Sequence, residues 1–405
     1  MVLLIVEARR LEFSQDYVRI LDTTLRDGEQ MPGISLTPQQ KLEIALALED
    51  AGVDAIEAGY PAVSEGEFKA VREIARNVYK SEVIALARAT KSDIDKAIEA
   101  EVPSVHLFIA TSEIHMKYKL KMSPEEVLEK AVWAVDYAKS HGLTVEFSAE
   151  DSTRSDPRFL VKVFQAVVDT GASRIDIADT VGVATPSSMK KLVEYVSTEV
   201  KGSYIISVHC HDDFGMSVAN SISAVEAGAR QVHVTVLGVG ERAGNAALEE
   251  VVTSLEFLLG FKTKVRLNAI PKLAELVSKH YKLVIPPNKA IVGANAFAHE
   301  SGIHVHGVLV NPLTYEPLDP SLLGLQRKIV VGKHSGRHAI EHVLKNLGIE
   351  PKKEVVDAVL LEVKRFGDIG IRVTDDVLIE IVRKVVNGQG EVFEDSGDRR
   401  RWNRT

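Results

Sequence analysis

Two histidines spaced two positions apart, His209 and His211, stand at the end of a short apolar run. Because side chains alternate along a β-strand, both imidazoles of such a pair project to the same face. Two imidazoles on one face, with a carboxylate nearby, form a divalent-metal site. The other interpretation is a pair of hydrogen-bonded core histidines. The position of the pair at the end of a strand favours the metal site.

A second polar stretch, LDTTLRDGEQ at residues 21–30, follows the apolar run Tyr17–Leu21. Acids, hydroxyls and an arginine just beyond a buried parallel strand are typical of the active end of an α/β barrel. The alternative is a solvated loop in which Arg26 and Asp27 form only a local ion pair. In a closed barrel the first and seventh strands are separated only by the eighth. Asp27 is therefore the natural third ligand beside His209 and His211.

The segment after the eighth expected strand, Gly240–Asn245, is rich in glycine, which lets the backbone approach the barrel centre. Asn245 has two interpretations. It is a fourth or outer ligand of the metal, or it is the N-cap of a helix over Ala246–Leu259.

Other expected strands also end in polar residues. Glu150 is a candidate general base or water ligand, and Arg154 is a candidate for bidentate binding of a carboxylate. Thr180 follows the sixth strand, and His106 lies on the fourth. The basic run His115–Lys121 either attracts an anionic cofactor tail or begins a solvated helix.

Three more histidines lie in the stretch His299–Gly307, outside the repeating pattern. They indicate either a second metal site or a proton-transfer loop that closes over a barrel mouth, because histidine titrates near neutral pH. No cysteine or well-spaced acid supports the second metal site.

The elements that must position these residues repeat from Val18 to about Gly260. Short β-branched runs alternate with amphipathic stretches that begin near proline and often end near glycine. The expected strands are Val18–Thr23, Ala55–Ala58, Val83–Ala87, Val105–Ile109, Thr144–Phe147, Arg174–Ile177, Tyr204–Val208 and Gln231–Val236. The clearest helices are Pro38–Ala51, Pro124–His141, Pro157–Thr170 and Pro186–Val200. This alternation predicts an α/β fold, a (β/α)₈ TIM barrel. A doubly wound sheet is the alternative, disfavoured because no GxGxxG follows the first strand.

After Gly260 the alternation stops. One helix is expected over Lys262–Pro286, and two more around Lys353–Phe366 and Asp375–Asn387. We therefore predict a mainly helical C-terminal region. The expected domains are an N-terminal segment (1–17), the catalytic barrel (18–260), a linker helix with a histidine-containing lid subdomain (261–345), a helical subdomain (346–393) and a disordered tail (394–405).

The composition excludes several classes of protein. A net charge of −8 without a basic face argues against a nucleic-acid partner. The one cysteine, Cys210, excludes an internal disulfide and fits a reducing cytoplasm. The first residues lack the features of a signal peptide, and no apolar run approaches the roughly 20 residues of a membrane helix. We expect a cytoplasmic enzyme without a membrane partner.

Seven ordered motifs resemble those of the homocitrate synthase and 2-isopropylmalate synthase family: DTTLRDGEQ, FIATSEIHMKYKL, VEFSAED, ADTVG, HCHDDFG, GERAGN and HESGIH. They span about Val18 to Gly336. The resemblance implies a TIM barrel with a helical C-terminal region, usually an intertwined homodimer. It also implies a divalent metal (Mg²⁺, Mn²⁺ or Zn²⁺) and acetyl-CoA as co-substrate, condensed with a 2-oxo acid.

The resemblance also implies a role for individual residues. Asp27, His209 and His211 would bind the metal, with Asn245 close to it. Arg26 would hold the 2-oxo acid and its developing alkoxide. Thr180 would contact the substrate carboxylate, and His106 would line the pocket. Glu150 and His304 would transfer protons, and His304 would reach the partner's barrel.

The choice of 2-oxo acid is predicted from a smaller set of residues. Arg154 and the runs IADTVGVATP and TVLGVGER resemble homocitrate synthases of lysine biosynthesis, which use 2-oxoglutarate; isopropylmalate synthases usually carry Asn at the position of Leu237. GERAGN and HESGIH also resemble isopropylmalate synthases, which use 2-oxoisovalerate in leucine biosynthesis. Leu309 stands where lysine-type homocitrate synthases have a tyrosine. We expect homocitrate synthase activity, with 2-isopropylmalate synthase as the alternative and a metal-dependent aldolase or lyase as the alternative of another class.

Overall fold

The computed structural model describes residues 17–388, and the chain divides into two compact units at Gly293 and Ala294. Each unit is described by itself. The expectations for the N-terminal segment, the absence of a signal peptide and the tail at 394–405 concern residues that lie almost entirely outside the described range.

The first unit is a closed barrel in which each parallel strand pairs with the next and β1 pairs with β8. The predicted (β/α)₈ fold is confirmed. All eight expected strands are present, with ends that differ by a few residues from those predicted. They are β1 (Arg19–Asp22), β2 (Ala55–Gly59), β3 (Glu82–Arg88), β4 (Ser104–Ala110), β5 (Thr144–Glu150), β6 (Arg174–Asp179), β7 (Ile205–Cys210) and β8 (Gln231–Val234).

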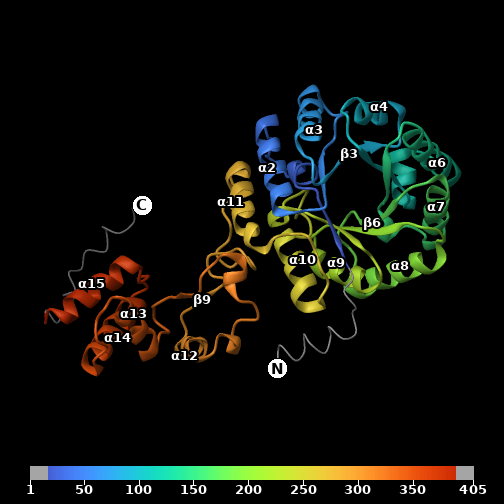
Figure 1. Cartoon of the computed structure of the whole chain (residues 1–405). Helices are drawn as coiled ribbons and strands as arrows, with labels where there is room; N and C mark the ends of the chain where they lie inside the picture. Colours follow the sequence, from blue (N-terminus) through green and yellow to red (C-terminus); the bar gives the residue numbers. More distant parts are fainter. Residues whose placement is uncertain (1–16, 389–405) are drawn as a thin grey trace. The chain divides into compact units, whose positions relative to one another are not determined.

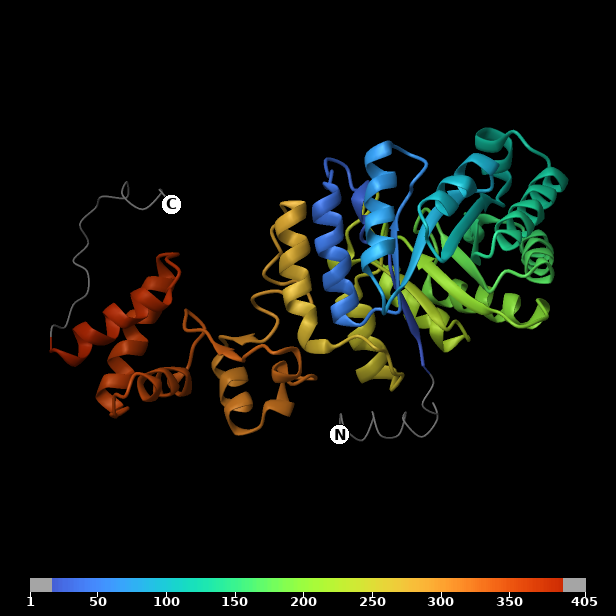
Figure 2. The same cartoon turned by 45° about the horizontal axis from the view of Figure 1, so that its top comes forward.

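Helices enclose the strands, as Figures 1 and 2 show. They are α2 (Pro38–Ala51), α3 (Glu65–Asn77), α4 (Lys91–Glu99), α5 (Glu113–His115), α6 (Pro124–Ser140), α7 (Pro157–Thr170), α8 (Pro186–Glu199), α9 (Ser217–Glu226), α10 (Leu248–Ser254) and α11 (Ile270–Tyr281). Local sequence fixes several starts. Thr37, Ser123 and Thr185 each cap a helix through a capping box, with proline in the first turn.

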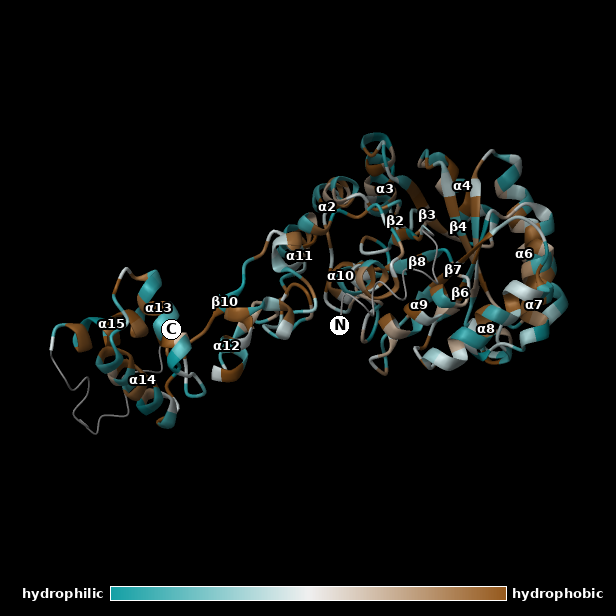
Figure 3. Cartoon of the chain, turned by 60° about the horizontal axis from the view of Figure 1, so that its bottom comes forward, coloured by the Kyte–Doolittle hydropathy of each residue, from teal (hydrophilic) through white to brown (hydrophobic). Residues whose placement is uncertain are grey.

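The two faces of the strands differ in chemistry. On β4 the residues Val105, Leu107 and Ile109 belong to the main hydrophobic core, which also includes the apolar face of helices such as α7. Figure 3 shows hydrophobic and hydrophilic faces on these helices. The alternate positions face the barrel interior, and many of them are polar and buried. On β7 this alternation separates Cys210, buried in the main core, from the histidines on either side.

Ion pairs fill much of the barrel interior. Glu146 accepts hydrogen bonds from Arg174 Nε (2.8 Å) and Gln231 Nε2, and it contacts His233 Nε2 at 2.7 Å. Arg174 also bridges to Glu82 at 2.8 Å, and Glu82 in turn pairs with Arg19. An apolar cluster of Leu21, Ala55 and Ile84 is separate from the main core. This interior is unlike the branched aliphatic filling common in such barrels.

The helix expected over Lys262–Pro286 is wrong in extent. The helix α11 covers only Ile270–Tyr281, after a single 3₁₀ turn. The chain before it is extended, because its backbone pairs with other segments of the barrel. Tyr17 bridges to Lys262, and the Arg266 amide donates to Ala51 O at 2.7 Å. The helix α11 lies beside α2 (Figure 2), where His280 contacts Glu43.

The second unit is mainly helical in its described part, as predicted for the C-terminal region. It contains the two-stranded sheet of β9 (Ala298–His299) and β10 (Lys328–Ile329). Its helices are α12 (Gly302–Val310), α13 (Arg337–Asn346), α14 (Lys353–Asp368) and α15 (Asp375–Val386). A separate core includes Ile340, Val359, Val363 and Ile381 and joins α13, α14 and α15. No helix within residues 17–388 is long and apolar enough to cross a membrane.

We predict that Lys41→Met destabilises the barrel. The Lys41 side chain is 1% exposed, and its ammonium lies 2.8 Å from Glu29 and 2.7 Å from Glu67. Removing the cation leaves both carboxylates without their counter-charge, at a cost of roughly 3 kcal/mol. The midpoint of chemical denaturation measures the effect. The control is Lys69→Met, because Lys69 is 66% exposed and its ion pair with Glu65 is weak. Equal midpoints for the two variants would contradict the prediction.

Candidate functional site

Asp27, His209 and His211 meet at the carboxyl end of the barrel strands, and all three are buried. The Nε2 atoms of the two histidines lie 3.3 Å apart. The Asp27 Oδ2 atom lies 3.7 Å from His209 Nε2 and 3.8 Å from His211 Nε2. The sequence prediction that these residues converge is therefore confirmed.

The charge state of the triad fits a divalent cation. Burial lowers the pKa of His209 well below its usual value and also lowers the pKa of His211, so both imidazoles are neutral near pH 7. The His211 Nδ1 atom lies 3.1 Å from Gly244 O, which assigns the proton to Nδ1 and leaves a lone pair on Nε2. That lone pair, the His209 ring and the Asp27 carboxylate converge. Nitrogen and oxygen donors in this arrangement suit Mg²⁺, Mn²⁺ or Zn²⁺.

Asn245 lies beside the triad, but it is not the helix N-cap. Helix α10 begins at Leu248 with Ala247 at the cap position. The Asn245 backbone instead bridges to His211, and its Nδ2 atom donates to Asp27 Oδ1 at 2.7 Å. Its Oδ1 atom is buried and accepts no hydrogen bond within the described residues. Gly240 permits this packing, because a Cβ there would lie 2.1 Å from Asn245 Nδ2 and 2.8 Å from Asp27 Oδ1.

Glu57, on β2, is a site residue that the sequence analysis missed. Its side chain is fully buried, with Arg26 Nε 2.6 Å from Oε2 and His106 Nδ1 2.8 Å from Oε1. Arg26 also donates through Nη1 to Asp27 at 2.6 Å. Glu57 therefore fixes the side chains of Arg26 and His106, which both line the pocket. The signal in the sequence was one acid within an otherwise apolar strand, AIEAG.

Burial alone would raise the pKa of Glu57, but the charges of Arg26 and His106 and the hydrogen bonds from them outweigh it. The pKa falls to about 2 from an ordinary value of 4.5. Glu57 is therefore an anion at neutral pH and balances the guanidinium of Arg26.

The pocket above the triad has a volume of about 280 Å³. Glu150 and Thr180 line it, together with Leu86, Phe108 and Ala178. Arg154, predicted to bind a carboxylate, is absent from this lining, and its Nε atom instead pairs with Asp151 at 2.8 Å. The basic run forms a turn in which Lys119 Nζ lies 2.5 Å from Glu150 Oε1.

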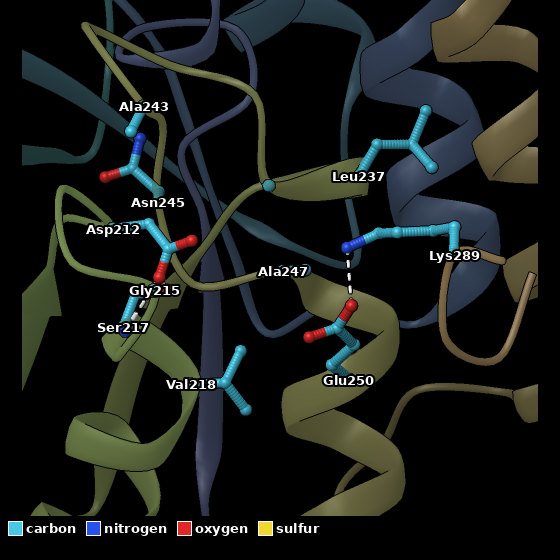
Figure 4. A pocket seen from close by; sticks show the side chains of 11 residues that line it. Asp212, Gly215, Ser217, Val218, Leu237, Ala243, Asn245, Ala247, Glu250 and Lys289 are labelled. Atoms are coloured by element: carbon cyan, nitrogen blue, oxygen red, sulfur yellow. Dashed lines mark hydrogen bonds and ion pairs between the residues drawn. The ribbon is translucent and has the colours of Figure 1, made fainter. Parts of the chain in front are cut away.

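A second hollow of about 160 Å³ lies between the loop after β8 and helices α9 and α10. Figure 4 shows Lys289 pointing into it and paired with Glu250. Asn245 belongs to its wall, whereas Asp27, His209 and His211 do not. The hollow is therefore separate from the pocket above the triad.

His304 lies on α12 in the second unit, where the ring of Tyr315 stacks on it at a centroid distance of 4.1 Å. His299 pairs with Glu316 at 2.9 Å. Within residues 17–388, Asp27, His209 and His211 are the only group of three or more acids, histidines or cysteines with ligand atoms close enough to share an ion. The alternative of a second metal site at His299–Gly307 therefore finds no support in the described residues.

Comparison with known proteins now places the chain. The HMGL-like family model matches residues 17–277, and the model described as "Homocitrate synthase post-HMGL domain-like" matches residues 291–371. The chain belongs to the HMGL-like family. Within this family it is an acyltransferase of the group formed by 2-isopropylmalate, homocitrate and citramalate synthases.

Two relatives and one solved structure are examples of proteins that are similar to this chain. A probable 2-isopropylmalate synthase of Ignicoccus hospitalis is 60% identical over 95% of this chain and 97% of its own length. A homocitrate synthase of Methanopyrus kandleri is 52% identical over 95% of this chain and 96% of its own. The Bacillus subtilis HMG-CoA lyase structure has a TM-score of 0.61 and 22% identity, over 68% of this chain and 96% of that one. This last likeness shows the fold alone.

We predict that His209→Ala removes bound metal and leaves the family's barrel folded. After dialysis against trace metal, each wild-type chain is expected to hold about one divalent ion. The variant should hold far less metal, because one of three converging ligands is lost. Elemental analysis measures the metal, and circular dichroism checks the fold. His280→Ala is the control, since His280 pairs with Glu43 and belongs neither to the triad nor to the pocket lining. Full metal content in His209→Ala would refute the assignment.

We also predict a pH-dependent stability contribution from Glu57. Its folded pKa of about 2 lies below the unfolded value of 4.5, so the contribution is complete above pH 4.5 and declines as pH falls towards 2. Glu57→Gln should therefore lower the free energy of unfolding by about 3 kcal/mol at pH 7 and by less near pH 3. Denaturant titrations at several pH values test this, with the surface variant Glu73→Gln as control. A difference independent of pH would exclude this account.

Proposed function

We propose that this chain is a 2-isopropylmalate synthase. It would condense acetyl-CoA with 2-oxoisovalerate and hydrolyse the thioester, releasing 2-isopropylmalate and CoA. The observation that carries the proposal is a buried triad of potential metal ligands beneath a pocket whose walls include Leu86, Phe108 and Ala178. A branched aliphatic side chain packs favourably against such walls.

The charges of the pocket disfavour a second carboxylate on the substrate. Two arginines line it, and both are paired with acids: Arg26 with Glu57 and Asp27, and Arg242 with Asp213 at 2.8 Å. The buried Asp176 carboxylate also lines the pocket, and its Oδ1 atom accepts no hydrogen bond within residues 17–388. The distal carboxylate of 2-oxoglutarate would add an anion without a free counter-charge.

The relatives support 2-isopropylmalate synthesis better than homocitrate synthesis, which the sequence analysis favoured. The Ignicoccus protein, named a probable 2-isopropylmalate synthase, is 60% identical to this chain, against 52% for the Methanopyrus homocitrate synthase. A Methanocaldococcus (R)-citramalate synthase reaches 52% as well. Homocitrate synthase and citramalate synthase are therefore the alternatives within the same reaction class.

The chemistry begins at the triad. A divalent cation held by Asp27, His209 and His211, with Asn245 beside it, would polarise the keto group of the 2-oxo acid. The Arg26 side chain is fixed through Nε and Nη1. Its Nη2 atom has no hydrogen-bond partner in the described chain and would donate to the oxygen that becomes an alkoxide. Thr180 would hold the substrate carboxylate, and His106 would line the pocket.

Glu150 would take a proton from the acetyl-CoA methyl group, because it lines the same pocket as Arg26 and the triad. The resulting enolate carbon would attack the keto carbon. We further propose that His304 takes part in proton transfer from the second unit of a partner chain, which makes the enzyme a homodimer. A cytoplasmic location remains part of the same proposal.

A metal-dependent lyase is the candidate of another class, because HMG-CoA lyases share the barrel. The match of residues 291–371 to the homocitrate synthase post-HMGL model supports a synthase instead. The motif HESGIH lies within that region.

The test is release of CoA thiol from acetyl-CoA in the presence of Mg²⁺ or Mn²⁺ and one 2-oxo acid at a time. We expect thiol release to depend on the 2-oxo acid, with kcat/KM for 2-oxoisovalerate above that for 2-oxoglutarate by at least about tenfold. Chelation of the metal should abolish the reaction.

Each other outcome has a clear meaning. A preference for 2-oxoglutarate restores the homocitrate interpretation, and a preference for pyruvate indicates citramalate synthesis. Cleavage of a hydroxyacyl substrate without any 2-oxo-acid-dependent thiol release would establish the lyase.

A further inference from the structure

A short π-helical turn, Met116–Leu120, follows α5 at the carboxyl end of β4. It ends at Lys121, which has a left-handed backbone with φ of +55°. Such turns are rare and often occur at functional sites. This one carries Lys119, whose ammonium lies 2.5 Å from Glu150 Oε1 and 6.0 Å from the centre of the Phe108 ring. Both of these neighbours line the pocket. Lys119 therefore stands at the pocket edge, against the proposed base.

The other basic groups near Glu150 are engaged elsewhere. His115 Nε2 lies 3.9 Å from Glu150, but His115 Nδ1 contacts Asp151 at 2.8 Å. Arg154 also pairs with Asp151. Lys119 is thus the nearest cation to the Glu150 carboxylate in the described chain. It engages Oε1 only, and within residues 17–388 the Oε2 atom accepts no hydrogen bond.

We propose that Lys119 is a positioning residue for Glu150. It holds Oε1 and so presents Oε2 to the methyl group of acetyl-CoA, a role that rests on the proposed function. In the step itself, the methyl proton moves to Oε2 and the C–H electron pair becomes the carbon–carbon double bond of the enolate. The negative charge moves from Glu150 to the thioester oxygen. Lys119 makes no bond to substrate and acts through the orientation of the carboxylate.

The experiment compares Lys119→Met, Lys119→Arg and wild type in the thiol-release assay, with the preferred 2-oxo acid and metal fixed. Lys119→Met should lower kcat about tenfold, because the carboxylate loses its orientation. The KM for the 2-oxo acid should stay unchanged, and Lys119→Arg should recover most of the rate. The matched control is Lys96→Met. Lys96 lies outside the pocket, its side chain is 46% exposed, and it pairs with Glu99 at 2.5 Å. The Lys119 side chain is similarly 48% exposed and pairs with Glu150 at 2.5 Å.

A double-mutant cycle separates positioning from binding of the CoA phosphates. If Lys119 acts through Glu150, Lys119→Met adds no further loss to the residual rate of Glu150→Gln. The proposal would be overturned if Lys119→Met raised the KM for acetyl-CoA at unchanged kcat, both in the wild-type enzyme and in Glu150→Gln. Lys119 would then bind acetyl-CoA instead of positioning Glu150. The proposal would also be overturned if the kcat losses of Lys119→Met and Glu150→Gln were independent of each other, or if Lys119→Met caused no loss of kcat.

The failure of the proposed function would look different. A folded wild-type chain that releases no thiol with any 2-oxo acid refutes the proposed function, and the role of Lys119 falls with it. An active wild type with additive variants refutes the Lys119 role alone.

Discussion

Charge balance inside the barrel is the constraint on which the site depends. Acids and bases of several strands are buried where aliphatic side chains are usual, so each anion requires a facing cation or donor. Glu57 balances Arg26 and His106, and Glu146 balances Arg174 and His233. Because Arg26 also contacts Asp27, the proposed metal ligand is joined to the ion pairs of Glu57. The His106 ring in turn meets the ring of His233 at a centroid distance of 5.4 Å.

This arrangement holds the side chains of the site through several partners each. Arg26 is held by two carboxylates, and Asp27 also accepts from Asn245. Groups fixed in this way need little reorganisation when charge develops on a substrate, which is the main source of electrostatic catalysis. The interior ions cost free energy in folding, but they support the chemistry proposed at the carboxyl end of the barrel strands.

The eight strands and the histidine pair could be predicted because their signals are local, and Asp27 followed from the order of the strands in a closed barrel. Alternation within β7 and proline at helix starts are visible in short windows of sequence. The interior network could not be predicted in this way, since Glu82 and Arg174 pair across 92 positions of the chain. Glu57 appears as one acid in an apolar strand. Asn245 was ambiguous because the expected helix began at Ala246, directly after it. The structure decides the question, since α10 begins at Leu248 with Ala247 at the cap position and Asn245 contacts Asp27 instead.

The orientation of Cys210 has a practical consequence for redox chemistry. The side chain lies in the apolar layer outside the strands, 1% exposed, and burial raises the pKa of its thiol. A protonated, inaccessible thiol resists oxidants and alkylating reagents. The candidate metal triad consists of nitrogen and oxygen donors without sulfur. Air or peroxide therefore has no exposed cysteine to attack among the residues described, and a chromogenic disulfide would report free CoA without a background from the folded protein.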